Sequence, residues 1–499
     1  MKFAKESNIP YYVFFTIFCF VLLFLISPDS YTHDAYNRMD SAWFFMCGKA
    51  WMNGMIPYVD FSDSKGPFLW FIYGIGYLLS HNSYHGIFWI SWIWYVAIYA
   101  FTFKTALIFL REPLKAFICT ILLTLSFFNP WFHYETRAED FTLLFLVISL
   151  YTVSSQLYSE GKKPNIYRSF GILGACFTAL LLIKFNIAAM QTVFSFYLYY
   201  YCIRNKYSFI RPIIYGLAGV LFAGLPFFIY FMIANNFDDF IHEYFLSTMS
   251  TDTHDSMIKV YLKEWKDVIN DPARLTLFTV IVTGCLQMSK KLGTDRYFPL
   301  ISSLFVFALT VRHSLWPYYF NSCSFLVIWF LTYIILDSNS ILRARHALII
   351  SLTVFCFSAF TNIFTNQAFR PIFFHHYPEK DHFKKISEIM ARTPKPTLIN
   401  AGYHEFGYGI KAHSLPGAKY WALQTGAPTT MINEHRKEIL SGKSDYIFVY
   451  NTTFLQKANL TLDELRHAGY SICYEWGDLN DRHYLMTKIK HLPELQVNI

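Results

Sequence analysis

Charged residues are scarce in this sequence. Asp, Glu, Lys and Arg make up 15% of the 499 residues, whereas hydrophobic residues make up 54%. Soluble domains carry about 25% charged residues, so the composition disfavours an ordinary soluble protein and favours one embedded in lipid. The net charge of +8 lies largely in short loops between apolar segments, which indicates membrane topology. We therefore expect no nucleic acid among its partners.

Paired cysteines are also lacking. The nine cysteines are scattered, and none forms a CxxC motif or a Cys/His pair with the spacing of a metal site. Only Cys47 and Cys473 are expected on the outer side of the membrane, so no disulfide framework is expected. The first apolar run, residues 11–26, lacks a small-residue cleavage site, and we interpret it as an uncleaved first span.

Apolar segments close to the length of a bilayer core recur along the first 366 residues. A span needs about 20 apolar residues, and several of these segments are somewhat shorter. We predict a polytopic α-helical membrane protein with about eleven transmembrane helices. The predicted spans are residues 11–26, 86–110, 116–132, 141–157, 169–185, 187–203, 212–234, 275–288, 297–311, 318–336 and 347–366.

The charges in the loops predict the orientation. If the N-terminus is cytoplasmic, every loop assigned to the inner side is basic, as the positive-inside rule requires. The basic residues of these inner segments are Lys2, Lys5, Arg111, Lys115, Lys162, Lys163, Arg168, Arg204, Lys206, Arg211, Lys290, Lys291, Arg296, Arg343 and Arg345. The segment from Phe68 to Ser80 is short, and this parity would be lost if it crossed. We therefore predict an outer-face interfacial or re-entrant helix there. We expect the chain in the cytoplasmic membrane, with its C-terminus outside.

The C-terminal tail differs in character from the rest of the chain. Its charge density is ordinary, and short apolar runs are separated by proline-containing stretches. The patterns predict strands at residues 396–401 and 445–450 and helices at residues 381–392 and 462–469. We therefore expect two domains: a transmembrane catalytic domain over residues 1–366 and a soluble extracytoplasmic α/β domain over residues 367–499.

The loop from Pro28 to Pro67 carries much charge for a segment beside a membrane. Asp40 opens a predicted amphipathic helix that runs to Asn53, and Gly54 is its stop signal. Two interpretations of Asp40 stay open. It is a helix cap, a role in which Asp is common, or it is a catalytic carboxylate held at the membrane surface.

Several short elements follow one another in this loop: DSAWF at 40–44, Gly48, Gly54, Pro-Tyr at 57–58, Asp60, and DSKGP at 63–67. In these elements the loop resembles the first outer loop of GT-C glycosyltransferases, above all the branch of protein mannosyltransferases and the bacterial aminoarabinose transferase of lipid A. The resemblance implies a polyprenyl- or dolichyl-phosphate sugar donor, Asp40 as the catalytic residue, and Lys65 beside the lipid phosphate. The family often has a second acidic residue next to its catalytic Asp, where this chain has Ser41.

Moving a sugar from a phosphate to a hydroxyl requires two kinds of group. A base accepts the hydroxyl proton, and cations stabilise the charge that develops on the leaving phosphate. Asp40 is the predicted base, and the predicted phosphate ligands are cations at the outer ends of spans: Lys65, Arg137, Lys184 and Arg312. Lys184 has no acidic neighbour in the sequence and also fits snorkelling to the interface. Arg137 also fits pairing with Glu135 or Glu139.

A second acidic cluster consists of Glu135, Glu139 and Asp140. If it approaches Asp40, the repulsion between carboxylates would raise the pKa of one of them or recruit a divalent cation. We expect this cluster to orient the acceptor or a metal ion. His133 and His313 are candidate metal ligands, although a lone interfacial histidine is commonly structural. The sequence therefore allows a divalent metal ion as cofactor and predicts no other.

Together these features predict an inverting glycosyltransferase that uses a polyprenyl-phosphate sugar. The acceptor is expected to be a hydroxyl of a cell-envelope glycan, lipid or protein on the outer side. One alternative is a transporter of lipid-linked glycans, which would place charged residues in the middle of its spans. The other is a non-enzymatic membrane scaffold, which would not need a carboxylate-rich loop beside aromatic interfacial helices.

Overall fold

The computed structural model describes residues 8–32, 39–127, 136–160, 163–247, 257–293, 295–312, 317–336, 380–402, 407–424, 426–478 and 482–488. Several predictions fall outside these described residues. They are the span at 347–366, the domain boundary at residue 366, and the candidate site residues His133, Glu135 and His313.

The chain divides into two compact units that do not follow its linear order. The helical unit comprises residues 1–27, 91–226 and 254–373, and the sheet unit comprises residues 28–90, 227–253 and 374–499. The divisions at residues 90 and 226 fall inside helices α4 (His85–Leu110) and α10 (Arg211–Ile233). The charged first loop and the C-terminal tail, which are distant in sequence, therefore belong to the same unit.

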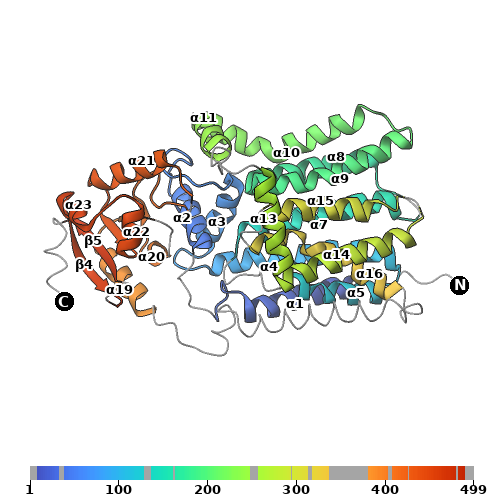
Figure 1. The fold of residues 1–499 in the computed structure, drawn as a ribbon, viewed down its shortest axis with the longest axis horizontal. Coiled ribbons are helices and arrows are strands. Elements are labelled where there is room, and N and C mark those ends of the chain that lie inside the picture. Colours follow the sequence, from blue (N-terminus) through green and yellow to red (C-terminus); the bar gives the residue numbers. More distant parts are fainter. Residues whose placement is uncertain are drawn as a thin grey trace. The chain divides into compact units, whose positions relative to one another are not determined.

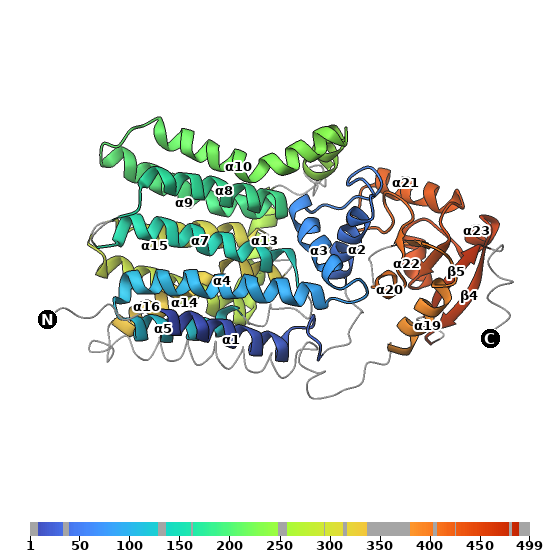
Figure 2. The same ribbon diagram turned by 180° about the vertical axis from the view of Figure 1, so that it is seen from behind.

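Most helices of the helical unit run side by side, and α13 crosses them (Figure 1). The described helices that lie wholly within this unit are α1 (Ile9–Ile26), α5 (Pro113–Leu122), α6 (Thr124–Phe127), α7 (Ala138–Tyr158), α8 (Ile166–Ile183), α9 (Phe185–Arg204), α13 (Met257–Asn270), α14 (Pro272–Lys291), α15 (Phe298–Val311), η2 (Pro317–Val327) and α16 (Ile328–Leu336). The views from the front and from behind both place α7, α8, α9 and α15 next to one another (Figure 2).

Six helices among the described residues are long and apolar enough to cross a membrane: Ile9–Ile26, His85–Leu110, Ala138–Tyr158, Ile166–Ile183, Arg211–Ile233 and Tyr318–Leu336. Each coincides with a predicted span, and the chain is a multi-pass membrane protein. The predicted spans at 187–203 and 275–288 form α9 and α14, which are long but less apolar. The predicted span at 297–311 forms the short helix α15, and the one at 116–132 is interrupted at Leu123.

The predicted span at 318–336 differs from a regular helix in its first half. Residues 317–327 form a 3₁₀ helix, η2, and only Ile328–Leu336 is α-helical. Polar side chains in η2 bond to backbone carbonyls: Ser324 Oγ donates to Asn321 O at 2.8 Å, and Cys323 Sγ donates to Phe320 O. Such bonds compete with regular helical geometry and favour the tighter winding.

The sheet unit begins with two closely packed helices, α2 (Asp40–Met52) and α3 (Pro67–Leu79). Both were predicted, α3 as an interfacial helix. A Cβ on Gly48 would lie 2.4 Å from the backbone nitrogen of Gly74, so only glycine permits this approach. One face of α3 is buried against α2, and its exposed face carries Phe71, Ile75 and Leu78.

A five-stranded mixed sheet forms the C-terminal part of the sheet unit, in the order β2-β1-β3-β5-β4 (Figure 1). The strands are β1 (Thr397–Asn400), β2 (Leu415–Pro416), β3 (Tyr446–Val449), β4 (Tyr470–Trp476) and β5 (His483–Lys488). Strand β1 pairs in parallel with β2 and β3, and β5 pairs antiparallel with β3 and β4. The accompanying helices are α19 (Lys380–Met390), α20 (Tyr408–Lys411), α21 (Thr429–Leu440), α22 (Thr452–Lys457) and α23 (Leu462–His467).

Candidate active site

Asp40 is the first residue of α2 and not its cap. The N-cap position is Met39, and no side-chain cap bond closes this end of the helix. The interpretation of Asp40 as the helix cap is therefore wrong, because Met39 holds the N-cap position. Asp40 lies in the first turn, where a negative charge suits the positive end of the helix dipole. The Asp40 side chain is half-buried, which leaves it accessible to a ligand.

Asp63 is a second carboxylate close to Asp40. It is buried at 6% exposure and accepts hydrogen bonds from the Ser64 backbone N–H at 2.6 Å and from the Gln424 side chain. Burial raises the pKa of Asp63, the Lys65 ammonium opposes this shift, and the negative charge of Asp40 adds to it. Among the described residues, Asp63 Oδ2 has no hydrogen-bond partner. We call Asp40, Asp63 and Lys65 the Asp40 site.

The loop that carries Lys65 is held in a defined shape. Tyr58 has a positive φ of 66° and donates through its hydroxyl to the carbonyl of Lys65 at 3.1 Å. Its ring is fully buried, with ring centroids 4.7 Å from Trp70 and 5.5 Å from Phe240. Asp60 accepts from the Ile56 backbone N–H at 2.7 Å, which makes it a turn residue. Lys65 donates to Ser64 Oγ at 2.9 Å.

Glu243 is a buried carboxylate that the sequence analysis missed. It lies in the π-helical segment η1 (Ile241–Leu246), which follows α11 (Phe237–Phe240). Ser62 and Tyr420 donate to it at 3.1 Å and 3.0 Å, and Lys419 Nζ lies 2.9 Å from its Oε1. Glu243 therefore fastens the first loop to the sheet-bearing tail. No local sequence pattern distinguishes it, because its partners come from distant segments.

A second link joins α2 to the tail. Lys49 is buried, and its ammonium donates to the carbonyl of Gly409 at 3.1 Å. The Ser62 backbone N–H donates to the carbonyl of Lys419 at 3.0 Å. Four residues of the first loop and α2, namely Lys49, Ser62, Asp63 and Trp43, thus contact residues 409–424. The Asp40 site is built on this junction.

The other predicted cations lie in the helical unit, where two of them share one cluster. Lys184, between α8 and α9, is buried and forms an ion pair with Glu139. Its Nζ lies 3.9 Å from the ring centroid of Tyr319, and the Arg137 guanidinium lies 3.9 Å from that of Tyr318. Snorkelling of Lys184 to the surface is therefore wrong. We call these residues, together with Asp140, the Arg137–Lys184 cluster.

Asp140 caps the N-terminal end of helix α7. Its Oδ2 accepts from the Arg137 backbone N–H at 2.8 Å, which closes a capping box. Its Oδ1 accepts from Asn321 Nδ2 at 3.3 Å, so η2 contacts α7 through this carboxylate. Glu139 and Asp140 are thus brought together with Arg137 and Lys184, a pairing of Lys184 with an acid that the sequence analysis did not predict.

Arg312 is not part of this cluster in the described part of the chain. Its Nη1 lies 3.8 Å from Glu264 Oε1, on the amphipathic helix α13, and its side chain is 37% exposed. Burial raises the pKa of Glu264 to about 7, although the charge of Arg312 opposes the shift. Arg312 therefore pairs with Glu264 and not with Glu139 or Asp140 in the described part of the chain.

The described residues contain no group of three or more His, Cys, Asp or Glu side chains placed to hold a metal ion. The Asp40 site offers two carboxylates with a lysine beside them, which falls short of the six to eight oxygens around calcium. The predicted divalent cofactor therefore stays a prediction.

No family model and no curated protein matches this sequence. Solved structures do match. Two crystal structures of ArnT from Cupriavidus metallidurans, bound to undecaprenyl phosphate and in the apo state, are each 10% identical in sequence to this chain. Their TM-scores are 0.58 and 0.60, and each match covers 98% of this chain and 99% of the ArnT chain.

A third structure has a different biological role by its description. The archaeal oligosaccharyltransferase AglB from Archaeoglobus fulgidus, in complex with an inhibitory peptide and a dolichol-phosphate, matches with a TM-score of 0.51 at 11% identity. The match covers 97% of this chain and 74% of AglB. At these identities the similarity concerns architecture. The chain has the fold of the GT-C membrane glycosyltransferases.

Proposed function

We propose that this protein is an inverting glycosyltransferase that moves a sugar from a polyprenyl-phosphate donor to an acceptor hydroxyl. The observation that carries the proposal is the Asp40 site: a half-exposed carboxylate, a buried carboxylate and a lysine gathered within range of one another's charge. The GT-C fold supports it, because a crystal structure of ArnT is bound to undecaprenyl phosphate and a structure of AglB is in complex with a dolichol-phosphate.

In the proposed reaction, Asp40 accepts the proton of the acceptor hydroxyl. The hydroxyl oxygen then forms a bond to the anomeric carbon while the bond from that carbon to the phosphate oxygen breaks. The departing phosphate takes the electron pair, and Lys65 stabilises the added negative charge. A single displacement from the opposite face inverts the configuration at the anomeric carbon.

Asp63 gains a role that the sequence analysis did not assign. Its Oδ1 is held by Ser64 and Gln424, whereas its Oδ2 has no protein partner among the described residues. A buried oxygen without a partner is costly, so a donor group on a ligand would satisfy it. We propose that Asp63 Oδ2 accepts from a sugar hydroxyl and orients the sugar beside Asp40.

The remaining predicted residues have different roles in the proposal. Arg137 and Lys184 are proposed phosphate ligands, and their partners Glu139 and Asp140 hold them in place. Arg312 is a proposed ligand that would have to exchange Glu264 for phosphate. We further propose that the protein lies in a cytoplasmic membrane with a cytoplasmic N-terminus, and that its acceptor belongs to the cell envelope.

The test uses purified protein in vesicles with a panel of polyprenyl-phosphate sugars and extracted envelope acceptors. Release of free polyprenyl phosphate is followed for wild type, Asp40→Asn and the matched control Asp60→Asn. Loss of a positioned base lowers the rate about 10²–10⁴-fold, so Asp40→Asn should be nearly inactive. Asp60→Asn retains an acceptor oxygen for Ile56 and should keep most activity.

Equal release by wild type and Asp40→Asn would remove Asp40 from the mechanism. Sugar-lipid movement across the bilayer without release would favour the transporter. A protein that neither moves nor cleaves any donor of the panel would favour the scaffold.

A further inference from the structure

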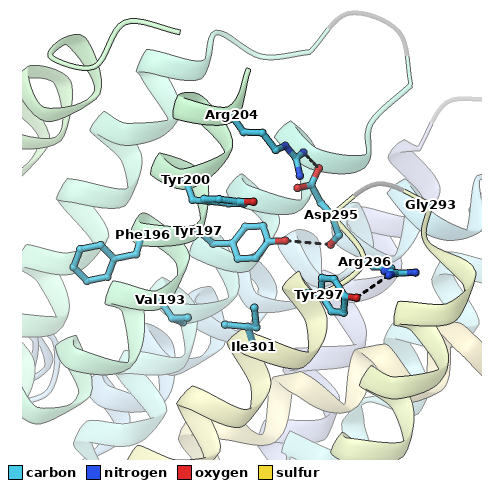
Figure 3. A pocket seen from close by; sticks show the side chains of 10 residues that line it. All are labelled: Val193, Phe196, Tyr197, Tyr200, Arg204, Gly293, Asp295, Arg296, Tyr297 and Ile301. Atoms are coloured by element: carbon cyan, nitrogen blue, oxygen red, sulfur yellow. Dashed lines mark hydrogen bonds and ion pairs between the residues drawn. The ribbon is translucent and has the colours of Figure 1, made fainter. Parts of the chain in front are cut away.

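A cavity of about 710 Å³ lies between α9 and the N-terminal end of α15, and none of its lining residues is predicted to act in catalysis. All of its lining residues belong to the helical unit. Helix α9 supplies Val193, Phe196, Tyr197, Tyr200 and Arg204, whose spacing places them on one face of the helix (Figure 3). The turn before α15 and its first residues supply the opposite wall. We call this cavity the α9–α15 groove.

The lining changes from polar to apolar along the groove. Arg204, Asp295 and Arg296 gather at one end, and Val193, Phe196 and Ile301 line the other (Figure 3). Because α9 rises about 1.5 Å per residue, Val193 and Arg204 are separated by about 16 Å along the axis. That distance is about half of a hydrocarbon core of about 30 Å, the depth of one leaflet.

The polar end carries a net positive charge. Asp295 is buried and forms an ion pair with Arg204 at 2.7 Å, so these two charges compensate each other. Arg296 is exposed and donates to the Tyr297 hydroxyl at 2.7 Å, and in the described part of the chain it forms no ion pair. Lys290 and Lys291 end the preceding helix α14. The groove thus has one uncompensated guanidinium at its mouth and further cations nearby.

Arg204 retains donors for a ligand as well. A guanidinium has five N–H groups, and one nitrogen, Nη2, bonds to Asp295. Tyr200 is more than half exposed beside it, with the Arg204 guanidinium 5.8 Å from the ring centroid. Tyrosine and arginine at the polar end of an apolar groove are the groups that recognise the headgroup level of a bilayer.

We propose that the α9–α15 groove binds one anionic phospholipid. Its phosphate would contact Arg296 and the outward N–H groups of Arg204, and one acyl chain would lie along Val193, Phe196 and Ile301. Charge complementarity selects an anionic over a zwitterionic lipid, because Arg296 forms no ion pair with any acidic residue that the structure describes. The site is separate from the proposed transfer reaction and does not depend on it.

The test is native mass spectrometry of the full-length purified protein after exchange into detergent with defined lipid. Phosphatidylglycerol and phosphatidylcholine with identical acyl chains are compared, for wild type, Arg296→Gln and the control Arg211→Gln. Arg211 is an exposed arginine at the start of α10 that does not line the groove. Wild type should retain one phosphatidylglycerol in preference to phosphatidylcholine. Arg296→Gln should weaken retention about tenfold, the effect of one charge-assisted hydrogen bond.

A second variant, Val193→Trp, fills the apolar end without changing any charge and should also lower retention of phosphatidylglycerol. Equal retention of the two lipids, or unchanged retention in Arg296→Gln, would overturn the proposal. Equal losses in Arg296→Gln and Arg211→Gln would also overturn it, because they would indicate general attraction to basic loops. Full retention in Val193→Trp would refute the placement of the acyl chain.

Discussion

At the scale of single residues, the helical unit buries two cations, Arg137 and Lys184. Removing a charged group from water costs several kcal/mol unless a partner of opposite charge is close. For Lys184 that partner is Glu139, and the face of Tyr319 adds a cation–π contact. Sequence reasoning identified all three charges, but Lys184 and Glu139 are 45 residues apart and their pairing depends on how α7 packs on α8 and α9.

The pairing predicts the outcome of breaking it. Glu139→Gln leaves Lys184 buried without its carboxylate and should destabilise the protein by about 3–5 kcal/mol. The double variant Glu139→Gln/Lys184→Met removes both charges and should regain most of that loss. Thermal unfolding in detergent measures the stability of each. A double variant as unstable as Glu139→Gln would contradict the ion-pair explanation.

His435 provides a pH dependence in the sheet unit. It is fully buried between the Gly402 N–H and the Tyr420 carbonyl, and burial lowers its pKa to about 4 from an ordinary value near 6.5. A lowered folded-state pKa means that stability is complete above about pH 6.5 and falls as the pH drops towards 4, by about 3 kcal/mol in all. Unfolding midpoints measured between pH 7.5 and 4.5 should decline, and the decline should be smaller in His435→Gln. Parallel declines in both proteins would assign the effect to other groups.

At the scale of elements, patterns in the sequence identified the helices and strands whose signals are local. Helix α2 and helix α3 follow from apolar periodicity with stop signals, and β1 and β3 from short apolar runs. The 3₁₀ segment η2 was not predicted, because it depends on side-chain bonds to the backbone and on Asn321 reaching Asp140. Strands β4 and β5 were missed because their alternation is irregular and β4 contains a register shift between Ile472 and Tyr474.

The close packing of α2 against α3 depends on Gly48. A methyl group there would meet the backbone of α3, so Gly48→Ala should force the helices apart and cost about 1–3 kcal/mol. Because α2 carries Asp40, a shift of this helix should lower transferase activity even at temperatures where the variant stays folded. The control is Gly216→Ala in α10, where an added Cβ has its nearest neighbour 4.0 Å away. Thermal unfolding and the polyprenyl phosphate release assay test both effects, and equal behaviour of the two variants would refute the steric argument.

At the scale of the whole molecule, the units of the fold do not coincide with the order of the chain. The charged loop supplies Asp40 and Lys65, and the structure places both within range of the charge of Asp63, in one cluster. Gln424 and Glu243 entered the surroundings of that cluster only through contacts between segments up to 361 residues apart. Such contacts leave no periodicity or spacing in a single sequence, so the support of the site could not be predicted from it.

Glu243 provides the final test, because it joins three distant segments within the sheet unit. Glu243→Gln removes the charge that Lys419 pairs with and should cost about 1.5–3 kcal/mol, the range for a hydrogen bond to a charged group. The first loop should then become more sensitive to limited proteolysis, and transfer should slow as Lys65 loses its position. Asp238→Asn removes an exposed carboxylate five residues earlier and serves as the matched control. In Glu243→Gln/Lys419→Met both charges are absent, so stability should return while the altered loop keeps activity low. If Glu243→Gln behaves like Asp238→Asn in both proteolysis and transfer, Glu243 does not support the loop.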